Sequence, residues 1–185
     1  MQIPVFFRLL LSTGMRTNEA RLLDCEDIDL KNGIIDIKHT KGWAQHRVAL
    51  HPSIWELLKR YDHAVKKLLP KRKVFFPTSD DKYHDMKWQV YAFSEIWRRI
   101  SKTDARPYDF RSNYAVKNIN RWNYDGTEWF DKLLVLGRSM GHKTLQSTCY
   151  YYQLAPMFPD MLETLSGSYL HDILPNLENF YNDET

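Results

Sequence analysis

Two short segments constrain the fold of this 185-residue chain most strongly. The isoleucine-rich segment "GIIDIK" (33–38) alternates as a strand does, because successive strand side chains point to opposite faces. The segment "HRVALHP" (46–52) is the predicted returning strand, and the polar turn "HTKGWAQ" (39–45) joins the two into a β-hairpin. The segment "KVFFP" (73–77) could add a third short strand. The predicted sheet is therefore small and antiparallel.

Much of the remaining chain has the apolar spacing of helices. In residues 53–68, Ile54, Leu57, Leu58 and Tyr61 recur at helical intervals. Thr17 or Asn18 could cap a helix that follows the first glycine turn. Further helices are predicted at residues 2–12, 18–25, 87–102, 109–121 and 127–139, with a short helix in the segment of three tyrosines and an amphipathic one near 158–166. The predicted class is mainly α with a small antiparallel β-sheet (α+β).

The charges are distributed unevenly along the chain. Residues 1–143 hold all 26 Lys and Arg residues and 17 of the 23 Asp and Glu residues, whereas residues 144–185 hold six acids and no Lys or Arg. A basic body favours a polyanionic partner, although an unevenly charged solvated surface is an equally reasonable reading. The two cysteines, Cys25 and Cys149, lack metal-ligand spacing and indicate a reducing compartment. No apolar run reaches the roughly 20 residues of a membrane helix, so we expect a cytoplasmic protein.

Four separate stretches carry residues suited to chemistry. In "TGMRTNEA", Arg16 and Glu19 are three residues apart on one helical face, as in many surface ion pairs. Lys41 lies at the tip of the predicted hairpin, where an ordinary polar turn is the simplest reading. In "RPYDFRSNYAV", Tyr108 and Arg111 lie near a helix start, where backbone N–H groups favour an anion. Each stretch alone is weak evidence for a site.

The fourth stretch, "GHKTLQSTCYYYQL" (141–154), contains a histidine followed by three consecutive tyrosines. The order of the four stretches resembles the tyrosine recombinases, the family of phage and transposon integrases. "TGMRTNEARLLDCEDIDL" is similar to the first arginine box of that family, and "KHTKG" to its lysine-bearing hairpin. "PYDFR" is similar to its "P-H-D-L-R" box, and "LGRSMGHKTLQSTCYYY" to its last box. The resemblance covers about residues 3–154.

The resemblance implies a set of catalytic residues and a nucleophile. In the family the tyrosine follows the histidine by nine residues, which selects Tyr151 after His142. Successive helical residues point about 100° apart, so three tyrosines in a row cannot all face one cleft. Tyr150 and Tyr152 are then expected to be packing or backbone-contacting residues. The implied catalytic residues are Arg16, Lys41, Tyr108, Arg111, His142 and the nucleophile Tyr151, with Glu19 in support.

The implied reaction needs no cofactor and no metal. Tyr151 would attack a DNA phosphate held by Arg16 and Arg111, and form a 3′-phosphotyrosine that a 5′-hydroxyl later reverses. Lys41 would protonate the departing oxygen. Tyr108 stands where the family has histidine, and a phenol does not carry the charge of an imidazole near neutral pH. A catalytically inactive DNA-binding remnant, which Tyr108 favours, remains an alternative. So does a type IB topoisomerase-like enzyme, which has the same chemistry but no strand exchange.

The implied partners are double-stranded DNA and further copies of the chain, as a tetramer on DNA. Residues 1–154 would form the catalytic domain and residues 155–185 an acidic helical tail that could dock on a neighbouring subunit or on its own. The family carries a DNA-clamping domain before the catalytic one, so we expect the sequence to be part of a longer protein. The predicted DNA-contacting residues lie in basic stretches: Lys66, Lys67, Lys71, Arg72, Lys73, Arg98 and Arg99, with residues 117–122 as a weaker candidate.

Overall fold

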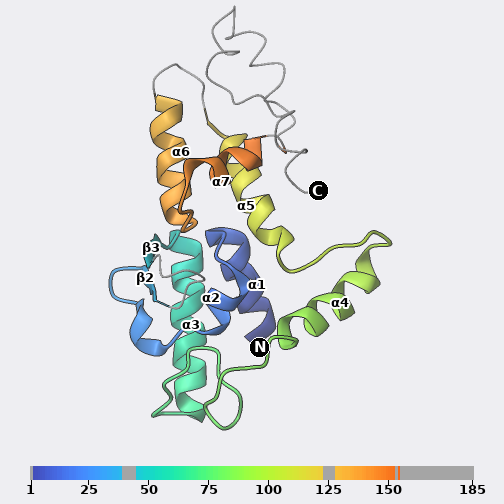
Figure 1. The fold of residues 1–185 in the computed structure, drawn as a ribbon. Helices are drawn as coiled ribbons and strands as arrows, with labels where there is room; N and C mark the ends of the chain where they lie inside the picture. The colour runs from blue at the N-terminus through green and yellow to red at the C-terminus, as the bar shows by residue number, and fades with distance from the viewer. Residues whose placement is uncertain (1, 39–44, 123–127, 153, 155–185) are drawn as a thin grey trace, which may run out of the picture.

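The structure, a computed structural model, describes residues 2–38, 45–122, 128–152 and 154, without the side chains of Glu128 and Tyr152. Figure 1 shows a chain that is helical over most of this part, with one small sheet. The helices are α1 (Gln2–Thr13), α2 (Thr17–Arg21), the 3-10 turn η1 (Cys25–Asp27), α3 (Pro52–Leu68), α4 (Trp88–Ile100), α5 (Asp109–Ile119), α6 (Glu128–Ser139), α7 (Leu145–Cys149) and the 3-10 turn η2 (Tyr150–Tyr152). The predicted α+β class is confirmed.

The sheet has three antiparallel strands in the order β1 (Ile28–Asp29), β2 (Ile34–Ile37) and β3 (His46–Ala49). Ile35 pairs with Ile28 on one side and with Val48 on the other, which confirms the predicted pairing of β2 with β3.

The prediction of a strand at 73–77 is wrong, because the third strand is β1. Val74 makes only an isolated bridge with Asp24. Phe75 and Phe76 are both buried, whereas consecutive residues of a strand on a one-sided sheet would alternate.

A first core lies between the sheet and helices α1 and α3. Its buried side chains include Phe6, Leu9, Ile35 and Leu58. Tyr61 closes this core, because its hydroxyl donates to the carbonyl of Phe75 at 3.1 Å while its ring packs inward.

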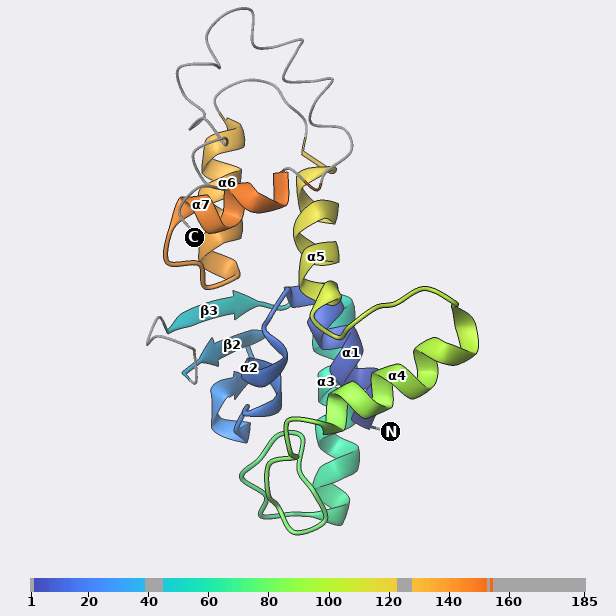
Figure 2. The ribbon, with the colours of Figure 1, turned by 45° about the vertical axis from the view of Figure 1, so that its right-hand side comes forward.

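A second core joins α5, α6 and the tyrosine segment. Ala115, Ile119, Leu133, Met140 and Tyr151 are its main buried members. Figures 1 and 2 show α5, α6 and α7 above the sheet and α1–α3, with the base of α5 beside α1. The two cores therefore meet near the C-terminal ends of α1 and α6 and the N-terminal end of α5.

Helix α4 extends sideways from this body (Figure 2). Phe93 holds it there, since its ring meets those of Phe7 and Phe110 at centroid distances of 5.8 and 5.6 Å. Within the described residues, every helix is too short or too polar to cross a bilayer.

Helix α2 begins one residue earlier than the sequence predicts. Its N-cap is Arg16 rather than Thr17 or Asn18, and the helix ends at Arg21. The shift follows from Glu19, whose carboxylate accepts the backbone N–H of Arg16 at 2.8 Å. The predicted tail helix near 158–166 lies outside the described residues.

Candidate active site

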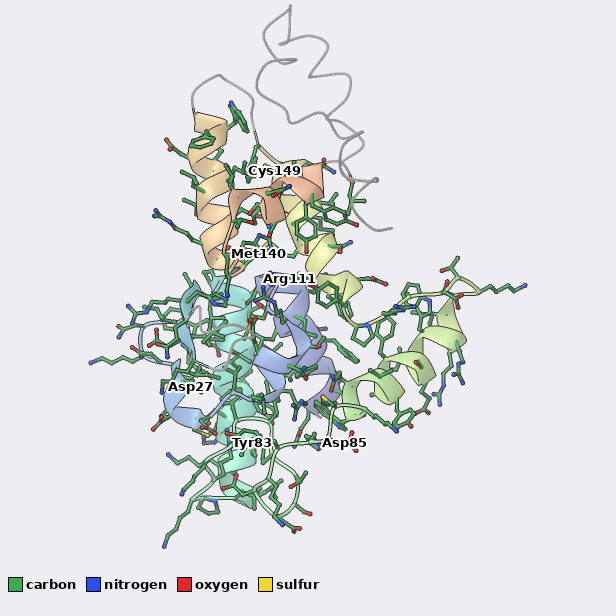
Figure 3. The ribbon with its side chains drawn as sticks, viewed as in Figure 1. Asp27, Tyr83, Asp85, Arg111, Met140 and Cys149 are labelled. Atoms are coloured by element: carbon green, nitrogen blue, oxygen red, sulfur yellow. The ribbon has the colours of Figure 1, made fainter. Side chains whose placement is uncertain are left out.

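Arg111 lies at the junction of the two cores and is only 1% exposed (Figure 3). Its Nη1 donates to the carbonyl of Gly14 at 2.6 Å, and its Nη2 donates to that of Met140 at 2.7 Å. The guanidinium thus connects the end of α1 to the end of α6 from its own place in the first turn of α5.

The charge of Arg111 has no counter-ion among the described residues, where no carboxylate pairs with it. Its Nε is buried and makes no hydrogen bond there. Burying an unpaired cation is costly, and backbone carbonyls compensate only part of the charge. The position is therefore suited to an anionic ligand.

Arg16 reaches the same region from the start of α2. Its Nη1 pairs with Glu19 at 2.7 Å, and its Nη2 donates to the carbonyl of Gly141 at 3.3 Å. Glu19 is buried and binds both the side chain and the backbone N–H of Arg16. The Arg16–Glu19 pair holds the guanidinium of Arg16 close to the segment that carries His142.

The end of α6 places His142. Gly141 takes a left-handed conformation with φ of 66°, and the N–H of His142 donates back to the carbonyl of Gly137 at 2.9 Å. This is the hydrogen bond of a glycine-terminated helix. A side chain at Gly141 would also collide with the ring of His46, because an added Cβ would lie 2.5 Å from its Cε1.

The imidazole of His142 is held by Thr148 on α7, with 2.8 Å between Nδ1 and Oγ1. Burial lowers the pKa of His142 to about 4, and the positive charges of Arg111 and Arg16 act in the same direction. The ring is therefore neutral at pH 7. A neutral imidazole can donate one hydrogen bond and accept another.

Of the three consecutive tyrosines, the side chains of Tyr150 and Tyr151 are described, and Tyr151 is the one that lies beside His142 and Arg111. It is 5% exposed, whereas Tyr150 is 57% exposed. Burial raises the pKa of the Tyr151 hydroxyl, and the charge of Arg111 opposes this shift. The phenol is thus neutral in the free protein and next to the buried guanidinium. The segment is a 3-10 turn rather than a regular helix, yet adjacent side chains still diverge.

The other two predicted catalytic residues are Tyr108 and Lys41. Tyr108 is the residue before α5 and is 48% exposed. The proximity of Tyr108 also raises the pKa of the Tyr151 hydroxyl, so Tyr108 borders the same site. Lys41 lies outside the described residues.

Sequence reasoning missed His46 and Thr148. His46 begins β3, and it lies against Gly141 and lowers the pKa of His142. Nothing in the local sequence of β3 indicates this long-range contact. Thr148 could have been found, because it belongs to the Ser/Thr-Thr pair before the tyrosines.

The predicted DNA-contacting residues lie in two places. Figures 1 and 2 show α3 starting beside β3 and running away from α7, so Lys66 and Lys67 lie at its far end. Arg98 and Arg99 are exposed on α4. Of the basic residues after α3, Lys71 and Lys73 are exposed, whereas Arg72 is not.

The structure does not place Arg72 on a surface that could contact phosphate. Its side chain is 3% exposed, and its Nη2 pairs with Asp62 at 2.7 Å. Its guanidinium also lies over the rings of Tyr61 and Phe75. We therefore leave Arg72 out of the proposed DNA contacts.

The model of the phage integrase family matches residues 1–157 of this chain. The chain belongs to the phage integrase family. The match includes both arginine boxes, the hairpin and the tyrosine segment.

Curated relatives carry integrase and recombinase names. A putative integrase/recombinase of Sinorhizobium fredii, y4rE, is 28% identical over 77% of this chain and 48% of its own length. The tyrosine recombinase XerA of Saccharolobus solfataricus is 26% identical over 90% of this chain and 48% of its own length. This integrase-family chain thus spans about half the length of these relatives.

Solved structures share the fold. A XerA recombinase superimposes with a TM-score of 0.71 at 16% identity, over 91% of this chain and 58% of the other. The XerH site-specific recombinase, in a post-cleavage complex with a palindromic difH substrate, gives 0.67 at 22% identity over 88% and 44%. The observed fold is that of a tyrosine recombinase catalytic domain.

Proposed function

We propose that this integrase-family chain is the catalytic domain of a site-specific DNA recombinase that cleaves and rejoins double-stranded DNA through a 3′-phosphotyrosine. The observation that carries the proposal is the buried guanidinium of Arg111, which has no carboxylate partner in the described chain and lies beside Tyr151. A phosphodiester would supply the missing negative charge at the place where the nucleophile is held.

The two arginines would fix and neutralise the phosphate. Arg111 approaches from α5 and Arg16 from α2, and each has a planar set of donors that fits phosphate oxygens. Their backbone contacts to Gly14, Met140 and Gly141 orient both side chains before DNA binds. Such preorganisation lowers the cost of binding the charge that develops during attack.

In the proposed reaction, Tyr151 Oη gives up its proton to water as it attacks phosphorus, and the bond from phosphorus to the 5′ oxygen breaks. His142 donates a hydrogen bond to a nonbridging oxygen, with Tyr108 in a similar role, and Lys41 gives a proton to the departing 5′ oxygen. A second DNA 5′-hydroxyl then displaces Tyr151 and rejoins the strand. The covalent link conserves the phosphodiester bond energy, so the step requires no nucleotide cofactor.

The relatives support this proposal at the level of family. XerH was solved with its difH substrate after cleavage, and the Tn1549 transposon integrase with transposon right-end DNA. We propose double-stranded DNA as the substrate of this chain, and we further propose that the chain self-associates as a tetramer on that DNA.

The proposal is tested by trapping on a nicked suicide duplex, from which the short fragment that carries the free 5′-hydroxyl diffuses away. The unmodified protein should form a covalent protein–DNA adduct, which Tyr151→Phe should abolish. Tyr150→Phe is the matched control, because its exposed ring lies next in sequence yet outside the site. An adduct that persists in Tyr151→Phe and vanishes in Tyr150→Phe or Tyr152→Phe would refute the assignment.

One observation favours a second candidate function. Tyr108 occupies the position of the family histidine, as expected for a DNA-binding remnant that has lost catalysis. If no adduct forms on any suicide duplex while DNA binding persists, the remnant is favoured. Strand exchange between two duplexes distinguishes a recombinase from a topoisomerase-like enzyme, which nicks and reseals a single duplex.

A further inference from the structure

Thr148 and His142 form a buried pair that none of the proposed catalytic steps explains. Thr148 is 0% exposed, and its Oγ1 lies 2.8 Å from Nδ1 of the imidazole. Threonine in a helix often bonds a backbone carbonyl one turn earlier. In the described part of the chain, the hydroxyl of Thr148 bonds only the ring of His142.

The direction of this hydrogen bond follows from burial. If Nδ1–H donated to Thr148, the hydroxyl proton of Thr148 would be buried without an acceptor, which is unfavourable. If the hydroxyl donates to Nδ1, both groups are satisfied. Nδ1 of a neutral ring then carries no proton, and the ring proton must be on Nε2.

Helix α6 makes room for this arrangement at Gly137. A Cβ added there would lie 2.7 Å from Thr148 Oγ1, closer than a side chain tolerates. The carbonyl of Gly137 also accepts the backbone N–H of His142 at 2.9 Å. Gly137 therefore fixes the backbone of His142 and admits the hydroxyl that holds its ring.

We infer that Thr148 is a positioning residue that fixes the orientation and the Nε2–H tautomer of His142, with Gly137 providing the space it needs. The functional consequence rests on the proposed recombinase activity: Nε2–H is the donor that a phosphate oxygen requires. The opposite tautomer would present a lone pair to the phosphate and repel it.

The charged and titratable groups around the ring are consistent with a neutral state. Arg111 comes from α5, Arg16 from the start of α2 and His46 from β3, and all three lower the pKa of His142. Because the ring carries no charge of its own, its effect on phosphate depends on which nitrogen bears the proton. Control of the tautomer by Thr148 is then required for donation.

The direct test is ¹⁵N correlation spectroscopy of the histidine rings at pH 7, with His142 assigned by His142→Gln. We expect the 185-residue chain to show His142 with protonated Nε2 and unprotonated Nδ1. Thr148→Val keeps the shape and removes the hydroxyl, so its ring should populate both tautomers. Thr148→Ser should restore the single tautomer. Ser147→Ala, an exposed hydroxyl on the same helix, is the matched control and should change nothing.

Cleavage of the suicide duplex gives the functional result. Thr148→Val should lower the rate about tenfold, the effect of one hydrogen bond, and Thr148→Ser should recover most of it. Gly137→Ala should resemble Thr148→Val.

An Nδ1–H tautomer in the unmodified chain overturns the inference even if Thr148→Val does not fold. A Thr148→Val protein that keeps both the single Nε2–H tautomer and the cleavage rate also overturns the inference. If the unmodified chain has the expected tautomer but cleaves no DNA, the proposed function fails and the role of Thr148 stands.

Discussion

The imidazole ring of His142 lies parallel to the phenol ring of Tyr151, with 5.8 Å between the ring centroids and 9° between the ring planes. The ring of Tyr150 packs edge-on against that of Tyr151, with 75° between the two ring planes. These contacts hold the proposed nucleophile within the second core and beside Arg111. In the proposed reaction, the attack on phosphorus would therefore start from a preformed arrangement of aromatic rings and guanidinium groups.

Inorganic phosphate should stabilise the free protein through Arg111. An anion at ten times its Kd contributes about 1.4 kcal/mol of unfolding free energy, or about 3–6 °C in Tm for a chain of this size. Differential scanning fluorimetry with phosphate, against chloride at equal ionic strength, measures the shift. The shift should disappear in Arg111→Met, because the buried counter-charge is removed.

The control for this experiment is Arg60→Met, an exposed arginine paired with Glu56 on α3. It should keep the full phosphate shift. Equal phosphate shifts in Arg111→Met and the unmodified protein would show that the anion binds elsewhere.

The sequence predicted most of the helices because their apolar positions recur at one interval. Helix α3 is the clearest case, since Ile54, Leu58 and Tyr61 are all buried on one side. The segment around Phe75 and Phe76 was misread as a strand because high β-propensity does not distinguish a strand from a buried irregular segment.

Tertiary contacts explain what the sequence could not show. A run of basic residues indicates exposed charge, yet Arg72 folds back onto Asp62 and becomes buried. In the same way, His46 reaches Gly141 only through the packing of β3 below α6. Candidate catalytic residues could be proposed from the family resemblance, but the tautomer that we infer for His142 depends on a contact that only the coordinates show.

Glu19 should contribute strongly to stability. Its carboxylate accepts both the backbone N–H and Nη1 of Arg16 in a buried setting. Glu19→Gln keeps the shape and loses the charge, so we expect a loss of about 1.5–3 kcal/mol in urea unfolding. Glu56→Gln, an exposed glutamate with two basic neighbours on α3, should leave the midpoint almost unchanged. Comparable midpoints for both variants would contradict the importance of the Arg16–Glu19 pair.

Stability should fall as pH drops from about 7 towards 4. The pKa of His142 is lowered from 6.5 to about 4 in the folded state, so the unfolded chain takes up a proton in this range while the folded chain does not. Protonation therefore favours unfolding. Urea titrations from pH 7 to pH 4.5 should show a shallower pH dependence for His142→Gln than for the unmodified protein.

His84 is the necessary comparison, because burial lowers its pKa in the same direction. It stacks on Trp88, and neither residue belongs to the site. His84→Gln should remove a separate part of the pH dependence and leave cleavage intact. A pH profile unaffected by His142→Gln would mean that the imidazole titrates normally in the folded protein.

Gly141 should matter for catalysis as well as for stability. Its φ of 66° makes alanine unfavourable by about 1–2 kcal/mol, and the added Cβ meets the His46 ring. Gly33 has a similar φ of 70° but lies beside Trp55, away from the site. Both Gly→Ala variants should unfold more easily, and only Gly141→Ala should also lose suicide-substrate cleavage. Equal loss of cleavage in the two variants would indicate a general folding defect.

Helix α4 should contribute phosphate contacts through Arg98 and Arg99, which are exposed in the last turn of the helix. In the free chain Arg99 pairs with Glu95 at 2.5 Å, an exposed and weak interaction that phosphate can replace. Each lost contact should reduce the slope of log K against log salt by about 0.9. Fluorescence anisotropy on a labelled duplex from 50 to 200 mM salt would measure this slope for Arg98→Ala and Arg99→Ala. Lys66→Ala with Lys67→Ala tests the far end of α3 in the same way, and Arg60→Ala is the control. An unchanged slope in both α4 variants would exclude this helix from the DNA interface.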